Sequence, residues 1–97
     1  MVKHVVMWKM SADSAESHAK EMKRQLETLV GQVPGMISLE AGLNGNADEA
    51  SADFVLITSH TSWEALHSYH THPEHLKVAA YIRSVVQARW AVDFETL

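Results

Sequence analysis

The stretch VKHVVMWKM, residues 2–10, alternates in character from one residue to the next. One set of positions holds Val2, His4, Val6, Trp8 and Met10, and the other holds Lys3, Val5, Met7 and Lys9. Successive side chains of a strand point to opposite faces, so the first face is almost wholly apolar and the second is apolar in its middle. A strand covered on one face and partly covered on the other is typical of the centre of a sheet, and we expect residues 2–10 there.

The segment that follows changes to the period of an amphipathic helix. Apolar residues recur at steps of four and three along one stripe: Ala15, Ala19, Met22, Leu26, Leu29 and Val33. The candidate N-caps, all with short polar side chains, are Ser11, Asp13 and Ser14. Gly31, followed by Pro34 and Gly35, is typical of the end of a helix.

Three more stretches have the composition of strands. Residues 36–44 and 52–60 lie on either side of a polar loop rich in turn residues. Residues 90–97 form a last strand, with Trp90, Val92 and Phe94 on one face.

Two helices are expected between the third and the last strand. Thr61 and Glu64 have the spacing of a capping box, which predicts a short helix over about residues 62–70. Pro73 suits the first position of the next helix, where its missing N–H costs nothing, and that helix extends toward residue 89.

The order strand, helix, strand, strand, broken helix, strand predicts an α+β fold of the ferredoxin-like, split βαβ type. Its antiparallel four-stranded sheet carries the helices on one face. A chain of 97 residues has room for one core, so residues 1–97 form a single domain.

Helices on one face leave the other face of the sheet open. Its expected residues are Val5, Met7, Val55, Ile57 and either Leu39 or Leu43. An apolar face of that size requires a cover, and two such sheets packed face to face give a homodimeric α/β barrel. The alternative is a monomer whose tail or long loop folds over the sheet.

The net charge of −4, with no run of lysine or arginine, argues against nucleic acid or an anionic membrane as the main partner, because both require a basic face. The absence of cysteine excludes disulfides, thiol catalysis and cysteine-ligated zinc. The apolar run before Lys9 is too short for a signal peptide or a membrane-spanning helix, so we expect a cytoplasmic protein.

The stretch HSYHTHPEHL, residues 67–76, allows three interpretations: a metal site, a proton-transfer site or a histidine-rich helix start. Two pairs, His67 with His70 and His72 with His75, have spacings that can chelate a metal, but no HExxH motif is present. His72 precedes a proline and suits an N-cap, and we expect His67 and His70 on the exposed helix face. The prediction is therefore that no metal is bound.

Four segments together resemble the stress-responsive α/β-barrel (Dabb) family: VKHVVMWKM, VPGMISLEAGLN, YHTHPEHL and RWAVDFE. They occur in the family's order over almost the whole chain. The resemblance implies the dimeric α+β barrel to which the burial pattern also points.

The same resemblance implies a candidate chemistry. Plant members of the family include a polyketide cyclase, which closes a poly-β-keto chain by aldol condensation without cofactor or metal. The matching positions are His75 as general acid/base, Tyr69 as the group that orients or polarises a carbonyl, and His4 in the same cavity. Phe54 stands where the plant cyclase has a further pocket histidine, which puts its substrate in doubt here.

Two functions follow as hypotheses. In the first, an apolar pocket binds a small keto or phenolic compound, and His75, Tyr69 and His4 perform cofactor-free acid/base chemistry. In the second, the protein is a ligand-binding or stress-associated dimer without turnover, where His75 is a hydrogen-bonded helix residue and His4 a satisfied core histidine. Two other expectations concern single residues. Arg83 pairs with a substrate carboxylate or, as the favoured alternative, with an acidic strand residue such as Asp93, and His60 ends its strand near the surface.

Overall fold

The computed structural model describes residues 1–13, 15–46 and 48–96. Its elements are β1 (Val2–Met10), α1 (Ala15–Glu27), β2 (Met36–Leu43), β3 (Phe54–His60), α2 (Trp63–Thr71), α3 (Pro73–Val85) and β4 (Val86–Glu95). The predicted order of strands and helices is confirmed. Of the three candidate N-caps of the first helix, Ser14 lies outside the described residues.

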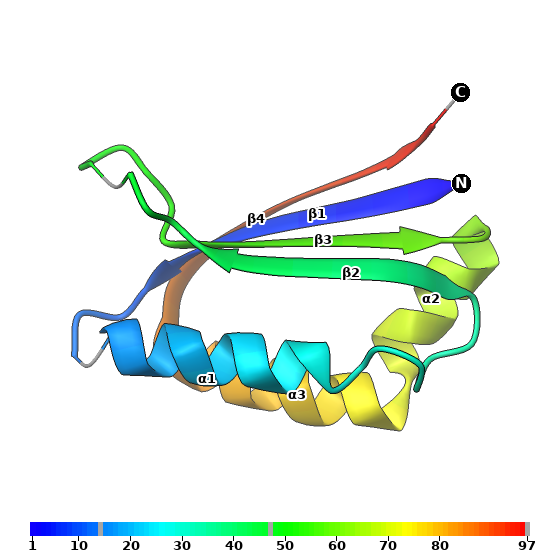
Figure 1. The fold of residues 1–97 in the computed structure, drawn as a ribbon, viewed down its shortest axis with the longest axis horizontal. Coiled ribbons are helices and arrows are strands. Elements are labelled where there is room, and N and C mark those ends of the chain that lie inside the picture. The colour runs from blue at the N-terminus through cyan, green and yellow to red at the C-terminus, as the bar shows by residue number, and fades with distance from the viewer. Residues whose placement is uncertain (14, 47, 97) are drawn as a thin grey trace.

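The four strands form one antiparallel sheet in the order β2-β3-β1-β4. The predicted central place of β1 is confirmed, because it pairs with β3 on one side and β4 on the other. All three helices lie on the same side of the sheet (Figure 1). The fold is therefore the expected ferredoxin-like α+β architecture.

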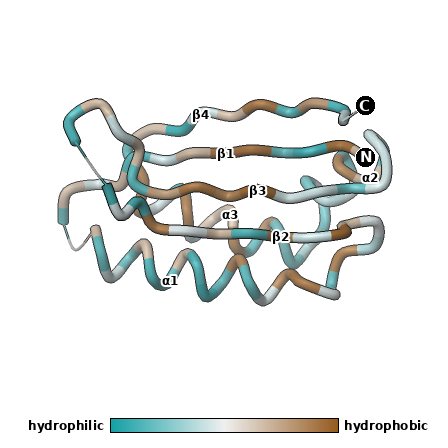
Figure 2. Tube along the Cα trace, turned by 45° about the horizontal axis from the view of Figure 1, so that its top comes forward, coloured by the Kyte–Doolittle hydropathy of each residue, from teal (hydrophilic) through white to brown (hydrophobic). Residues whose placement is uncertain are grey.

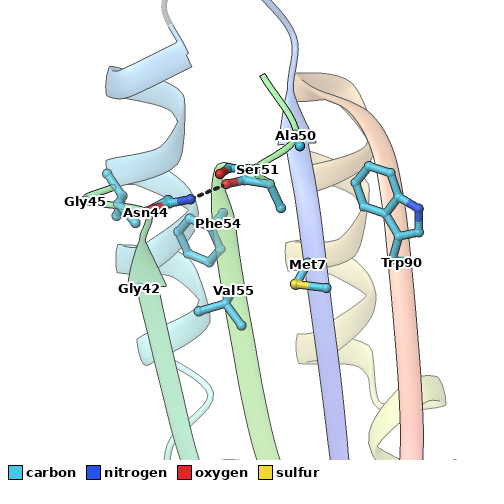
Figure 3. A pocket seen from close by; sticks show the side chains of 11 residues that line it. Met7, Gly42, Asn44, Gly45, Ala50, Ser51, Phe54, Val55 and Trp90 are labelled. Atoms are coloured by element: carbon cyan, nitrogen blue, oxygen red, sulfur yellow. Dashed lines mark hydrogen bonds between the residues drawn. The ribbon is translucent and has the colours of Figure 1, made fainter. Parts of the chain in front are cut away.

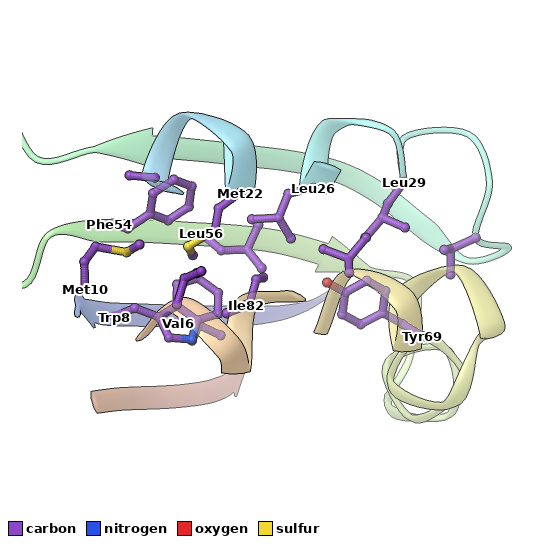
Figure 4. Close-up of a cluster of buried hydrophobic side chains, with 14 of the residues drawn as sticks. Val6, Trp8, Met10, Met22, Leu26, Leu29, Phe54, Leu56, Tyr69 and Ile82 are labelled. Atoms are coloured by element: carbon purple, nitrogen blue, oxygen red, sulfur yellow. The ribbon is translucent and has the colours of Figure 1, made fainter. Parts of the chain in front are cut away.

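The core lies between the sheet and the helices. Val6 and Trp8 of β1 meet Met22 and Leu26 of α1 there (Figure 4). Apolar residues are concentrated along β1 and β3, and the outer side of α1 is hydrophilic (Figure 2). This division is the one that the alternation in β1 and the stripe of α1 require.

The helix α1 ends before its apolar stripe does. The helix stops at Glu27, yet Leu29 is only 1% exposed and Val33 only 5%. Backbone bonds of the tighter i to i+3 kind, such as Leu29 N–H to the Leu26 carbonyl at 3.0 Å, continue the chain in the same direction. A turn of tighter pitch therefore keeps the stripe on the core.

Two boundaries of the later helices differ from the prediction. The N-cap of α2 is Ser62 and not Thr61, since the Ser62 hydroxyl accepts from the Ala65 N–H at 3.1 Å. The backbone N–H of Thr61 instead donates to the Gly35 carbonyl at 2.9 Å, which fixes Thr61 outside the helix. The helix α3 ends at Val85, short of residue 89, because pairing with β1 already begins at Val86.

The break between α2 and α3 falls at His72. Its backbone is extended, with a ψ of 134°, and Pro73 follows as the first residue of α3. The ring Nδ1 of His72 accepts from the Glu74 N–H at 3.1 Å. The predicted N-cap role of His72 is confirmed, and the cap sets the angle between the two helices.

The face of the sheet away from the helices is open. In register there, Val5 lies opposite Val92 and Met7 opposite Trp90. Val92 is 63% exposed and Trp90 52% exposed. This face therefore presents large apolar side chains to solvent.

The expectation that Leu39 or Leu43 would join the open face is wrong. Leu39 lies opposite the buried Thr58 and packs against the core, and Leu43 lies opposite Phe54. The positions of β2 that share the open face are instead Glu40, opposite Ile57, and Gly42, opposite Val55. Within the described residues, no helix combines the length and apolarity needed to cross a bilayer.

Candidate functional site

A cavity of about 220 Å³ lies on the helical side of the sheet. Most of its wall is apolar, from residues such as Val6, Leu56 and Val78. The polar residues that line it come from four elements: His4, Tyr69, His70, His75, Arg83 and Arg89. It therefore brings together all three residues that the sequence singled out.

His4 is held by a carboxylate from the neighbouring strand. His4 lies directly opposite Asp93 in the β1–β4 ladder and is only 3% exposed. Because an ionised carboxylate only accepts, Nδ1 of His4 donates to Oδ1 of Asp93. Among the described residues no hydrogen bond engages the other ring nitrogen, so Nε2 is an acceptor available to the cavity.

The expected ion pair between Arg83 and Asp93 is wrong. The strand register places Asp93 beside His4, and the Asp93 carboxylate accepts the hydrogen bond from Nδ1 of His4. Arg83, from α3, lines the cavity instead.

Tyr69, near the end of α2, is the central ring of the cluster. It is fully buried, and its ring centroid lies 4.3 Å from that of His75 and 5.0 Å from that of His60. Its buried hydroxyl has no hydrogen-bond partner among the described residues. Burial raises the pKa of the Tyr69 phenol, so the group stays protonated at neutral pH and can donate.

His75 is oriented by the helix break. Its Nδ1 donates to the carbonyl of His70 at 3.1 Å, a bond that the extended backbone at His72 allows. This bond leaves Nε2 as the acceptor nitrogen. Burial lowers the pKa of His75 by more than the hydrogen bond to the His70 carbonyl raises it, and the charges of His70, His4 and Arg89 add to the lowering. The ring is therefore a neutral base at pH 7.

His70 belongs to the cluster, and the expectation that it would be exposed is wrong. Its ring centroid is 4.9 Å from that of His4, and its Nε2 is buried without a partner in the described chain. Burial is also the main cause that lowers its pKa. Its spacing from Leu66 and Tyr69 is that of one helix stripe, a signal that could have identified it. His67, by contrast, is exposed as expected.

The second histidine that the sequence misplaced is His60. It is fully buried at the end of β3, because α2 begins three residues later and covers that end of the strand. Its Nε2 lies 2.8 Å from the Thr58 hydroxyl. Burial lowers its pKa to about 4, and the nearby charges of His4 and His70 contribute.

A larger hollow, of about 710 Å³, lies on the open face beside the hairpin between β2 and β3. Met7 and Trp90 border it on one side, and Asn44 and Ser51 on the other (Figure 3). The described residues that line it include no histidine, acid, lysine or arginine. The histidines, the tyrosine and the arginines that the sequence analysis and the structure single out therefore line the smaller cavity and not this hollow.

Within residues 1–13, 15–46 and 48–96, no group of three or more histidines and acids is arranged to hold a metal ion. The spacing of His67 and His70 does not bring them to one site, because only His70 lines the cavity. His72 uses its Nδ1 as the cap of α3. In each of the two predicted chelating pairs, one histidine lines the cavity (His70 or His75) and the other lies elsewhere, His67 on the surface and His72 at the N-cap of α3.

Solved structures share this fold over nearly the whole chain. A dimeric ferredoxin-like protein of unknown function from Bacteroides fragilis is 26% identical, with a TM-score of 0.88, and the match covers 98% of this chain and 95% of the other. A hydroxynitrile lyase from Passiflora edulis is 13% identical, with a TM-score of 0.82 and coverage of 96% and 90%. SnoaB, described as a cofactor-independent oxygenase from Streptomyces nogalater, is 16% identical, with a TM-score of 0.80 and coverage of 99% and 92%.

Among curated proteins, no match to this sequence was found. The model of one family, described as the stress responsive A/B barrel domain, matches residues 2–96. The resemblance seen in the opening strand, the Tyr69–His75 segment and the last strand thus extends over the whole domain. The chain belongs to the stress responsive A/B barrel family.

Proposed function

We propose that this protein is a cofactor-free acid/base enzyme that enolises a small keto compound and directs it to aldol condensation or isomerisation. One observation carries the proposal. The buried phenol of Tyr69 has no hydrogen-bond partner among the described residues, and its ring centroid lies 6.1 Å from that of His4 and 4.3 Å from that of His75. Each of these imidazoles has one nitrogen oriented by a hydrogen bond and the other available. Structural polar groups in a core are normally satisfied, so an unsatisfied donor beside a cavity is explained by a ligand that completes it.

His75 and His4 have different environments, which suit them to different roles in the reaction. Nε2 of His75, kept neutral by burial, removes a proton from the carbon next to a carbonyl. The electron pair of that C–H bond forms the C=C bond of an enolate, and the Tyr69 hydroxyl donates to the enolate oxygen.

The same base completes the reaction. The enolate carbon attacks a second carbonyl, whose π electron pair moves to its oxygen, and that oxygen takes up the proton that His75 had removed. In isomerisation His75 returns the proton to another carbon of the enolate. Asp93 holds the ring of His4 in place with the proton on Nδ1, so Nε2 of His4 accepts a hydrogen bond from a hydroxyl of the ligand. Protons are returned and electron pairs move only within the substrate, so the oxidation state does not change.

The solved relatives support catalysis as a role that this fold can carry. One is named as a hydroxynitrile lyase and another as a cofactor-independent oxygenase. Neither name gives a substrate for this chain. The chemistry proposed here rests on its own cavity.

Exchange of the acidic protons of methyl acetoacetate into D₂O, followed by NMR, tests the proposal. We expect the protein to accelerate exchange above the buffer rate in a saturable way. His75→Ala, Tyr69→Phe and Asp93→Asn should each lower the accelerated rate by about 10²-fold or more. Asp13→Asn, at an exposed position away from the cavity, is the matched control.

Tyr69→Phe also separates catalysis from folding. Removing a buried hydroxyl that has no partner should leave the free energy of unfolding unchanged or raise it by about 1 kcal/mol. Saturable binding of the ester with no accelerated exchange would instead support the non-catalytic, ligand-binding alternative.

We further propose that a second copy of the chain covers the open face of the sheet. The exposed apolar side chains Trp90, Val92 and Phe94 of β4 support this, since a patch of this kind is uncommon on a monomer. The Bacteroides fragilis relative, described as dimeric, supports it as well. The helical side, with its cavity, remains outside such an interface.

A further inference from the structure

Two arginines from different elements converge on the cavity. His75, Ala79 and Arg83 follow one another at steps of four along α3, and all three line it. Arg89 enters from β4, where it lies opposite Trp8. Both side chains are exposed as well as lining the cavity, so a helix and a strand each place one arginine at its solvent-facing side.

Neither arginine has a protein partner. Most other lysine and arginine side chains of the described residues form ion pairs with a carboxylate, namely Lys9, Lys20, Lys23, Arg24 and Lys77. Among the described residues, no salt bridge or hydrogen bond is formed by the guanidinium of Arg83 or Arg89. Both side chains are exposed, so their N–H groups are solvated in the free protein and available to a ligand at the cavity.

The remaining polar groups of the cavity also favour a ligand rich in oxygen. The Tyr69 hydroxyl and Nε2 of His70 are buried and lack partners in the described chain. Nε2 of His4 and of His75 are the acceptors of the cavity, and the N–H groups of two arginines with the Tyr69 hydroxyl outnumber them as donors. A keto oxygen suits the phenol, and a carboxylate suits the guanidinium groups, which bind it in bidentate fashion.

The size of the cavity restricts the ligand further. A volume of about 220 Å³ equals that of roughly seven water molecules, at about 30 Å³ each. Sites for drug-sized ligands are larger, at about 300–1,000 Å³. The ligand therefore has on the order of ten non-hydrogen atoms.

The two ends of the cavity differ in character. His4 lies opposite Asp93, and Arg89 lies opposite Trp8, four residues farther along β1. At about 3.3 Å per residue, those backbone positions are roughly 13 Å apart. The field of Arg89 still extends to the rings, because its charge adds to the burial that lowers the pKa of His70.

We propose that the ligand of this cavity is a small keto carboxylate, with its carboxylate held by Arg83 and Arg89 and its carbonyl directed to Tyr69. The inference names the substrate class of the proposed function and rests on that function for the reacting end of the ligand. The arginine end is independent of turnover.

Calorimetric titration of the whole protein with acetoacetate and with its neutral methyl ester tests the inference. We expect acetoacetate to bind in the millimolar range or better, and at least about tenfold more tightly than the ester. Arg83→Gln and Arg89→Gln should each weaken acetoacetate binding by about tenfold and leave the ester unchanged. Arg24→Gln, which removes a guanidinium from the outer face of α1, should change neither.

The inference is overturned if the ester binds as tightly as acetoacetate, if acetoacetate does not bind, or if both arginine variants bind it normally. Inorganic phosphate binding as tightly as acetoacetate would also overturn the assignment to carboxylates. Urea unfolding of each variant checks that the fold is intact. Proton exchange of the neutral ester tests catalysis without the carboxylate, so the two proposals fail separately.

Discussion

His60 is a titratable ring enclosed by the core. His60 is the last residue of β3, and its side chain is fully buried against the ring of Tyr69. Burial is the main cause that lowers its pKa to about 4, from an ordinary value near 6.5. The folded state therefore resists a proton that the unfolded chain accepts readily.

This difference predicts a loss of stability in mild acid. Between pH 6.5 and about 4 the unfolded state binds the proton and the folded state does not, so the free energy of unfolding falls as the pH falls through that window. Burial also lowers the pKa of His70 and of His75, which steepens the fall. Urea unfolding at pH 7.5, 6 and 5 measures it.

The variant His60→Gln should reduce this pH dependence, because glutamine can still bond to Thr58 but takes up no proton. His67→Gln, at an exposed position, is the matched control. Identical pH dependence in the wild type and His60→Gln would contradict the prediction.

Sequence reasoning identified part of the candidate site. His4, Tyr69 and His75 were chosen from the strand pattern and the family resemblance, and they line one cavity. Asp93 as the partner of His4 was missed, because a contact between residues 89 apart depends on strand register, which no local pattern encodes. His70 was missed because Trp63, Leu66 and Tyr69 were expected to fill the buried face of the helix. Trp63 is in fact 39% exposed, and His70 shares the buried stripe with Leu66.

At the scale of elements, the turn before β2 shows why a glycine is required. Gly35 has a φ of +85°, and a Cβ there would lie 2.7 Å from the Cβ of Ala65 in α2. Gly31 has a similar φ of +79°, but a Cβ there would meet nothing within 4 Å. The two glycines share one backbone constraint and differ in their surroundings.

This pair gives a matched prediction. Gly31→Ala should lower the free energy of unfolding by about 1 kcal/mol, the cost of a left-handed backbone for alanine. Gly35→Ala should cost about 1–3 kcal/mol more, because α2 must shift to admit the methyl group. Equal losses in urea unfolding would show that the contact with Ala65 carries no cost.

The elements themselves were largely predictable, since period-two and helical patterns are local properties of the chain. The residues at which the helices begin and end were less predictable. The cap of α2 moved from Thr61 to Ser62 because a long-range bond to Gly35 holds Thr61. Likewise, α3 ends at Val85 because the residues from Val86 onward pair with β1 in the sheet.

For the molecule as a whole, the open face of the sheet sets the expected assembly. Val92 lies on that face in the edge strand β4, opposite Val5 of β1, and is 63% exposed. Val92→Lys would set a charge within the proposed interface, so we expect it to convert the homodimer into a monomer of 10.8 kDa. Light scattering after gel filtration at micromolar concentration measures the mass.

The matched control is Val30→Lys, in the turn after α1, where Val30 is 57% exposed. It should leave the mass at that of the dimer. A wild-type protein that elutes as a monomer would contradict the proposed assembly, and the cover of the sheet would then have to come from another molecule.

The pairing of β1 with both β3 and β4 also has a consequence for biosynthesis. Of the four strands, β1 is synthesised first and β4, beside which it lies in Figure 1, last. A nascent chain therefore holds β1 without either neighbour until β3 has emerged, and with one open edge until β4 follows. Exposed strand edges promote aggregation. Slowing the emergence of β4, for example with rare codons near its start, should lengthen the nascent chain's association with chaperones.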